Sequence, residues 1–239
     1  MSEAPRPIVV AIDGPAASGK SSTARWVAER LGFHHVDSGA LYRAATLLAM
    51  REHGADAAGW DAERLAREAA RVTLVPVPAG FDPAIDGRSV AEAVRGSEVT
   101  RNVSAVAQMR PVRAWVNARV RDASRSRSVV VDGRDIGTVV FPDAALKVFL
   151  VADPWERARR RLLQTLGRAP ADPEIAAETA RLVERDARDA TQTVQARDAV
   201  LLDTTYLTQP EQVERIVALV RALPAGGAGD AGRGAGSAA

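Results

Sequence analysis

The chain has 239 residues, of which 46% are hydrophobic and 26% are charged. These values are typical of a globular domain, with or without inserts, that buries its own core. The absence of cysteine excludes disulfides and cysteine-ligated zinc sites. No apolar run resembles a signal peptide or is long enough to cross a bilayer, so we expect a cytoplasmic protein without a membrane segment.

The formal net charge is only +2, yet the isoelectric point is about 9.5. All basic residues except Lys20 and Lys147 are arginines, which stay charged at any ordinary pH and bind phosphates through two N–H groups. A general nucleic-acid-binding protein usually has a strong basic excess, which this chain lacks. We therefore expect small-molecule partners rather than nucleic acid. We also expect a monomer.

Short apolar segments with the character of buried strands alternate along the chain with segments that have a helical pattern. Such alternation predicts an α/β fold, in which helices cover both faces of a parallel sheet. The predicted strands are Ile8–Asp13, Phe33–Val36, Ser128–Asp132, Leu146–Val151 and Ala199–Asp203.

Several helix ends are marked by capping residues. A helix is predicted at Lys20–Leu31, closed by Gly32, and another at Gly39–Arg51. Asp153 and Thr208 are predicted N-caps, because each is followed within one turn by a proline and a glutamate.

A region at about 61–105 interrupts this alternation. Arg71–Val77 alternates like a half-exposed strand, and Asp86-Gly87 favours a hairpin turn. We therefore expect a small insert with antiparallel strands.

The arginine-rich region at about 157–190 is predicted to be helical, with a break near Gly167–Pro173. The folded domain is expected to occupy residues 1–223. Residues 224–239 are mostly glycine and alanine, and a disordered tail is predicted there.

The segment Gly14-Pro-Ala-Ala-Ser-Gly-Lys-Ser21 fits the phosphate-binding pattern G-x-x-x-x-G-K-[ST], between an apolar strand and a helix. Glycines let the backbone N–H groups turn toward phosphate oxygens, and the helix points its positive end at the same anions. Lys20 can reach the β and γ phosphates, and Ser21 can bind Mg²⁺. The predicted ATP-binding residues are Gly14, Pro15, Ala16, Ala17, Ser18, Gly19, Lys20, Ser21 and Ser22.

This loop alone does not identify a reaction, because ATPases, GTPases, nucleic-acid motors and small kinases all use it. The chain has no Asn-Lys-x-Asp motif for guanine, and it is short for a motor domain. A kinase with a small acceptor is the class that remains. A non-enzymatic nucleotide-binding protein is a less favoured alternative.

Three further motifs, Asp37–Arg43, Asp132–Pro142 and Glu184–Asp189, resemble those of bacterial cytidylate kinases in order and spacing. The resemblance implies a P-loop kinase with three α/β/α layers, a five-stranded parallel sheet, an acceptor-binding insert and a helical lid. It also implies Mg²⁺-assisted transfer of the γ-phosphoryl group from ATP to CMP or dCMP, which gives CDP or dCDP and ADP. A kinase for another nucleotide or small metabolite is the alternative.

The resemblance further implies an acceptor site. Ser104, Arg113 and Asp135 match positions that read cytosine, and a carboxylate can accept from the N4 amino group of that base. Uracil carries an oxygen in place of the amino group, so Asp135 would repel it. Arg43 would bind the acceptor phosphate. The predicted acceptor-binding residues are Ser38, Arg43, Ser104, Arg113, Arg134, Asp135, Arg185 and Asp189.

Four of these residues also have a simpler interpretation. Arg43 and Ser104 have the character of ordinary helix-surface residues. Arg185 and Asp189 could form an intrahelical pair, because they are four residues apart.

Asp132 ends a predicted strand near the loop, where P-loop proteins keep an acid for Mg²⁺, so Ser21 and Asp132 are the predicted metal-binding pair. Arginines in the predicted lid would close over the transferring phosphoryl group, although an exposed basic helix face explains them equally well. The predicted catalytic residues are Lys20, Arg134, Arg157 and Arg161, with Arg160 in the same lid segment.

The chain departs from the family pattern at one place. A further arginine usually follows about three residues after the acid that Asp189 matches, but Thr191-Gln192 stands there. One phosphate contact is therefore either missing or supplied by Arg197.

Overall fold

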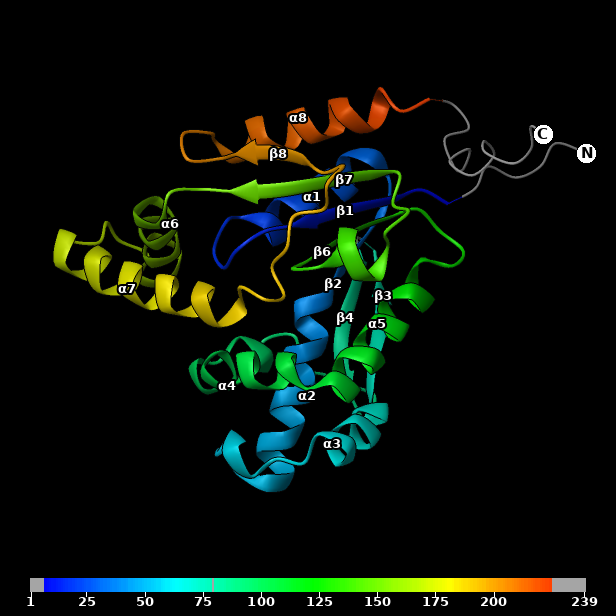
Figure 1. Ribbon diagram of the computed structural model, residues 1–239, viewed down its shortest axis with the longest axis vertical. Coiled ribbons are helices and arrows are strands. Elements are labelled where there is room, and N and C mark those ends of the chain that lie inside the picture. Colours follow the sequence, from blue (N-terminus) through cyan, green and yellow to red (C-terminus); the bar gives the residue numbers. More distant parts are fainter. Residues whose placement is uncertain (1–6, 79, 225–239) are drawn as a thin grey trace, which may run out of the picture.

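The computed structural model describes residues 7–78 and 80–224 (Figure 1). The predicted disordered tail lies outside the described residues except for Pro224. Every helix in the described part of the chain is too short or too polar to cross a lipid bilayer.

Five parallel strands form the main part of the sheet, as the apolar segments predict. They are β1 (Val9–Asp13), β2 (His34–Asp37), β6 (Val129–Gly133), β7 (Leu146–Val151) and β8 (Val200–Asp203). Their spatial order is β2-β6-β1-β7-β8, so β1 lies in the middle. Val10 of β1 pairs with Val130 of β6, and Ile12 pairs with Val148 of β7.

Helices cover both faces of this sheet, because side chains along a buried strand alternate between the faces. Val10 and Ile12 share one apolar cluster with α1 and α8, whereas Ala11 joins the cluster of α2 and α5 on the opposite face (Figure 1). The predicted three-layer α/β/α fold is confirmed. The covering helices are α1 (Lys20–Leu31), α8 (Gln209–Arg221), α2 (Ser38–His53) and α5 (Arg110–Ser124).

The predicted helix caps are confirmed. Gly32 adopts a left-handed conformation with φ 68° at the end of α1. The Asp153 side chain accepts from the backbone N–H groups of Trp155 and Glu156. Thr208 forms a capping box with Glu211 at the start of α8.

The predicted insert extends the main sheet instead of forming a separate one. Within it, β3 (Val72–Val77) pairs antiparallel with β4 (Gly80–Ile85), which pairs with β5 (Arg88–Ser89) across the predicted Asp86-Gly87 turn. A single residue pair, His35 with Gly80, joins β4 to β2. The insert also contains α3 (Ala62–Glu68) and α4 (Ser97–Gln108).

Two helices form the predicted lid segment, α6 (Pro154–Leu166) and α7 (Asp172–Asp189). They lie side by side as an arm at one end of the sheet (Figure 1). The predicted break is confirmed, because Gly167 ends α6 in a left-handed conformation and Pro173 lies in the first turn of α7.

Gly80 is required at the junction of insert and sheet. A Cβ at this position would lie 2.4 Å from the backbone oxygen of His35. We expect Gly80→Ala to lower the free energy of unfolding by about 1–3 kcal/mol, because the overpacked strands must move apart. Gly59→Ala is the matched control, since nothing lies within 4 Å of its Cβ position. Chemical denaturation of the two variants checks the difference, and equal stabilities would show that β4 adapts without cost.

Candidate active site

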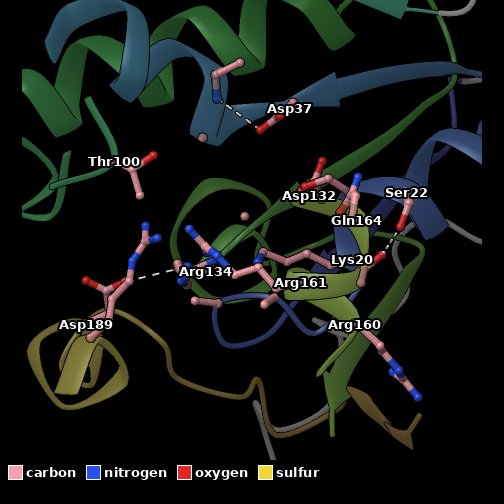
Figure 2. Close-up of a pocket in the computed structure, with 18 of the residues that line it drawn as sticks. Lys20, Ser22, Asp37, Thr100, Asp132, Arg134, Arg160, Arg161, Gln164 and Asp189 are labelled. Carbon is pink, nitrogen blue, oxygen red and sulfur yellow. Dashed lines mark hydrogen bonds and ion pairs between the residues drawn. The ribbon is translucent and has the colours of Figure 1, made fainter. Parts of the chain in front are cut away.

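A cleft of about 1200 Å³ opens at the carboxyl ends of β1, β2 and β6, between the insert and the two lid helices. Ligands of α/β proteins bind at this edge of the sheet. The volume exceeds the roughly 300–1,000 Å³ of a usual small-molecule site, which leaves room for two ligands. Lys20, Arg134 and Arg161 gather near the centre of the cleft, with Asp189 and Thr100 on the side opposite Ser22 (Figure 2).

The predicted phosphate-binding loop connects β1 to the start of α1. Gly14 has φ 150°, and a Cβ there would lie 2.3 Å from the backbone oxygen of Leu150, so only glycine fits. Ala17 and Gly19 have φ values of 57° and 87°, which turn successive N–H groups toward one point. The loop therefore has the shape of an anion site. Its cleft-lining residues are Ala16, Ala17, Gly19, Lys20, Ser21 and Ser22, whereas Gly14, Pro15 and Ser18 are not among them.

Lys20 is buried at the base of the cleft, and its Nζ donates to the Pro15 carbonyl at 3.1 Å. Burial, with the nearby charge of Arg134, lowers the pKa of Lys20 to about 7. An anion in the loop would restore the full charge of the ammonium, because an opposite charge favours the charged form.

Asp132 and Ser21 meet as the sequence predicts, since the Ser21 hydroxyl donates to the Asp132 carboxylate. Burial alone would raise the pKa of Asp132, but the hydrogen bond with His35 and the charges of His35 and Lys20 lower it instead. An ionised carboxylate beside a hydroxyl suits Mg²⁺, which usually takes one or two protein ligands and completes its shell with water and phosphate. The pair therefore fits the predicted metal site.

Four arginines converge on the loop from different elements. Arg43 comes from α2, Arg134 from the end of β6, Arg161 from α6 and Arg185 from α7, and all line the cleft. Burial, with the charge of Arg134, lowers the pKa of Arg185 to about 10.

Their positive charge is only partly balanced. Asp189 lies 3.6 Å from both Arg134 and Arg185, which is too far for a good hydrogen bond. Among the described residues, the buried Nε atoms of Arg134 and Arg185 have no partner. Buried donors without partners are uncommon, and next to a phosphate-binding loop they suit an anion.

The predicted base-reading residues also meet in the cleft. Arg113 of α5 forms an ion pair with Asp135, which follows β6. Ser104 of α4 lines the same part of the cleft and is only 8% exposed, so it is not an ordinary surface serine. Burial raises the pKa of Asp135 against the opposing charge of Arg113.

The predicted acceptor residue Ser38 is buried at the first position of α2, where its hydroxyl donates to the Asp132 carbonyl at 2.8 Å. Arg43 donates to Thr100 at 2.9 Å and to the Val94 carbonyl at 3.2 Å. It is therefore held between α2 and the insert rather than solvated on a helix surface.

Arg157 does not line the cleft, unlike the other predicted catalytic residues. It is 3% exposed, and its Nη1 donates to the Ala16 carbonyl at 2.8 Å and pairs with Asp186 at 2.7 Å. The other Asp186 oxygen accepts from the Ala16 N–H at 3.3 Å. Arg157 and Asp186 thus hold the phosphate-binding loop from behind, and the geometry favours a positioning role for Arg157 over direct phosphoryl contact.

Arg160 also points away from Lys20 (Figure 2). It donates to the Thr204 and Thr205 carbonyls, both at 2.7 Å. These bonds tie α6 to the connection between β8 and α8.

The segment after β6 is held by a buried acid that the sequence analysis did not select. Asp13, at the end of β1, accepts from the N–H groups of Ile136 and Gly137, both at 2.8 Å. These residues begin a π-helical turn, Ile136–Val140, directly after Arg134 and Asp135. Asp13 therefore sets the position of both site residues, and a carboxylate that ends a strand immediately before the loop is the signal that could have identified it.

Two more residues have contacts that the sequence patterns do not indicate. The Nε2 atom of His35 lies 2.7 Å from Oδ1 of Asp132. Asp186, within the motif Glu184–Asp189, contacts Arg157 and the Ala16 N–H. In both cases the partner is distant in sequence, so spacing gave no signal.

Removal of Arg157 should destabilise the protein. We expect Arg157→Ala to lower the free energy of unfolding by about 3 kcal/mol, because it leaves Asp186 without its cation and the loop without its anchor. Arg188→Ala is the matched control on α7. Its pair with Glu184 is exposed and 3.7 Å long, so the expected loss is below about 1 kcal/mol. Urea denaturation measures both, and equal losses would contradict the anchoring role.

The pKa of Asp13 gives a dependence of stability on pH. Burial raises this pKa from 3.8 to about 6, so the folded chain binds more protons between these values and loses stability as the pH rises through them. The variant Asp13→Asn lacks this contribution. The stability of the unmodified protein relative to the variant should therefore fall by up to about 3 kcal/mol between about pH 4 and 7. Denaturation of both proteins at several pH values tests this. A difference in free energy of unfolding that does not change with pH would contradict it.

Comparisons with known proteins show the family to which the chain belongs. Among solved structures, a shikimate kinase from Bacteroides thetaiotaomicron is similar with a TM-score of 0.45 and 13% identity, over 90% of this chain and 98% of its own. Residues 10–222 match the sequence model of a family described as Cytidylate kinase. A protein named Cytidylate kinase from Chlorobaculum tepidum is 44% identical over 91% of this chain and 94% of its own. One of the same name from Nocardia farcinica is 42% identical, with coverages of 90% and 94%. The chain therefore belongs to the cytidylate kinase family and is a nucleoside monophosphate kinase.

Proposed function

We propose that the protein transfers the γ-phosphoryl group of ATP to CMP or dCMP, with Mg²⁺, and acts as a monomer in the cytoplasm. One observation carries the choice of acceptor. The same cleft contains arginines with unpartnered N–H groups beside the phosphate-binding loop and, further along, the buried Arg113–Asp135 pair. The first group suits the phosphates, and the pair suits a base that offers both a donor and acceptors.

The donor phosphates would occupy the loop between β1 and α1. Its N–H groups and the start of α1 favour anions there, and Lys20 lies at the base of the loop. Ser21 and Asp132 would hold Mg²⁺ on this side. Mg²⁺, when bound, neutralises phosphate charge.

The acceptor would lie on the side of the insert. Arg43, Arg134 and Arg185 would bind its phosphate, while Ser104, Arg113 and Asp135 would read the base. Asp189 lies between Arg134 and Arg185, where it could accept from a ribose hydroxyl. This arrangement brings an acceptor phosphate oxygen next to the γ-phosphate in the loop.

The transfer requires positioning and charge stabilisation more than proton abstraction. An ionised acceptor phosphate is already nucleophilic, so no strong general base is required. Lys20, Arg134 and Arg161 would stabilise the charge on the transferring group. Closure of α6 and α7 over the cleft would exclude water and so suppress hydrolysis of ATP.

A panel of acceptors with Mg·ATP in a coupled assay tests the proposed function. We expect CMP or dCMP to exceed UMP in kcat/KM by at least about a hundredfold, because uracil would place an oxygen against the Asp135 carboxylate. In Asp135→Asn the ratio of kcat/KM for CMP to that for UMP should fall, since an amide can donate to the C4 oxygen of uracil. Another acceptor turning over faster than CMP or dCMP, or UMP matching them, would reject the assignment in favour of a kinase for a different metabolite.

A further inference from the structure

Gln192 lies at the edge of the cleft, just beyond the end of α7. Its backbone N–H donates to the Asp189 carbonyl at 2.9 Å. Its side chain lines the cleft, where Oε1 accepts from Nη1 of Arg113 at 3.0 Å. The segment that follows α7 therefore contacts the base-reading pair through the side chain of Gln192.

The hydrogen bonds of Arg113 show that Gln192 helps to fix the orientation of the guanidinium. A guanidinium has five N–H groups. Nη1 donates to the Ala107 carbonyl at 3.1 Å and to Gln192, while Nη2 donates to Asp135. Both Nη1 protons are thus occupied by protein. Within the described part of the chain, the protons left for a ligand are the second one on Nη2 and the one on Nε.

We infer that Gln192 is a specificity-determining residue, which positions Arg113 so that cytosine is accepted and uracil is rejected; this inference rests on the proposed function. Asp135 would accept from the N4 amino group of cytosine, and the free Nη2 proton beside it would donate to a ring acceptor. Both contacts use the guanidinium in its observed orientation.

Uracil requires a different orientation of Arg113. It presents an oxygen at C4 and an N–H at N3, so the guanidinium would have to shift until its free Nη2 proton faces the C4 oxygen instead of N3. The bonds from Nη1 to Ala107 and Gln192 hold the guanidinium against this shift. Gln192 therefore discriminates against uracil by keeping the donor opposite N3.

The same residue explains the departure noted in the sequence. The family usually has an arginine at about this position, and Arg197 was the alternative source of the charge. Arg197 is exposed and does not line the cleft. A glutamine adds no charge, so this chain has replaced an expected phosphate contact with a contact to the base-reading arginine.

Steady-state kinetics with CMP and UMP test the inference on three variants. Gln192→Met keeps the size of the side chain but removes the acceptor, so its ratio of kcat/KM for UMP to that for CMP should rise about tenfold, the effect of one hydrogen bond. Gln192→Glu keeps an acceptor for Arg113 and should retain the original ratio. Gln195→Ala is the matched control, because Gln195 is exposed and does not line the cleft.

The KM for ATP should stay unchanged in all three variants, and thermal unfolding confirms that each is folded. A merely structural role would change kcat for both acceptors equally and leave the ratio as it was. If the unmodified enzyme prefers CMP and Gln192→Met keeps the same ratio, this inference is overturned while the proposed function stands. If the unmodified enzyme does not prefer CMP, the proposed function itself is overturned.

Discussion

Repulsion between buried cations governs the cleft. Lys20 lies near Arg134 and Arg185, and burial together with the charge of Arg134 lowers the pKa of both Lys20 and Arg185. Without an anion, these groups repel each other in a medium that screens poorly. Bound phosphates would remove this repulsion and would accept from the unpartnered N–H groups. The proposed ligands would therefore complete an electrostatic arrangement that the protein alone leaves unfavourable.

The fold holds these cations close together despite their mutual repulsion. The central strands are buried on both faces, and their carboxyl ends deliver Asp13, Asp37 and Asp132 to one edge. Each acid has a distinct partner. Asp13 orders the turn after β6, Asp37 caps α2, and Asp132 pairs with His35 and Ser21. Asp13 and Asp37 thus fix the backbone around the cations, while Asp132 fixes two side chains at the edge of the cleft.

The parts that the sequence predicts well depend on local patterns. Short apolar segments bounded by turn signals mark the parallel strands, so the sequence predicts all five to within one or two residues. The phosphate-binding loop is one contiguous motif, and the helix caps follow from residues within a single turn.

Contacts between distant residues could not be predicted in this way. The join of the insert to β2 depends on one glycine, and its pairing with His35 has no periodic signature. Arg157 resembles its neighbours in an arginine-rich helix, yet it alone is turned inward by Asp186. The bond from Gln192 to Arg113 spans 79 residues and depends on where α7 ends. The acceptor site as a whole was recognised through family motifs, because no local rule indicates which helices converge on it.

The arrangement of α7 has a thermodynamic consequence. Within about one helical turn, this helix carries Asp186, which holds the donor loop, and Arg185 and Asp189, which face the acceptor side. A rigid element that contacts two sites couples their occupancy. If ATP shifts the loop, α7 transmits that shift to the acceptor contacts. The coupling free energy between the two sites is the same whichever substrate binds first. The two substrates would therefore change each other's affinity by an equal factor, whichever arrives first.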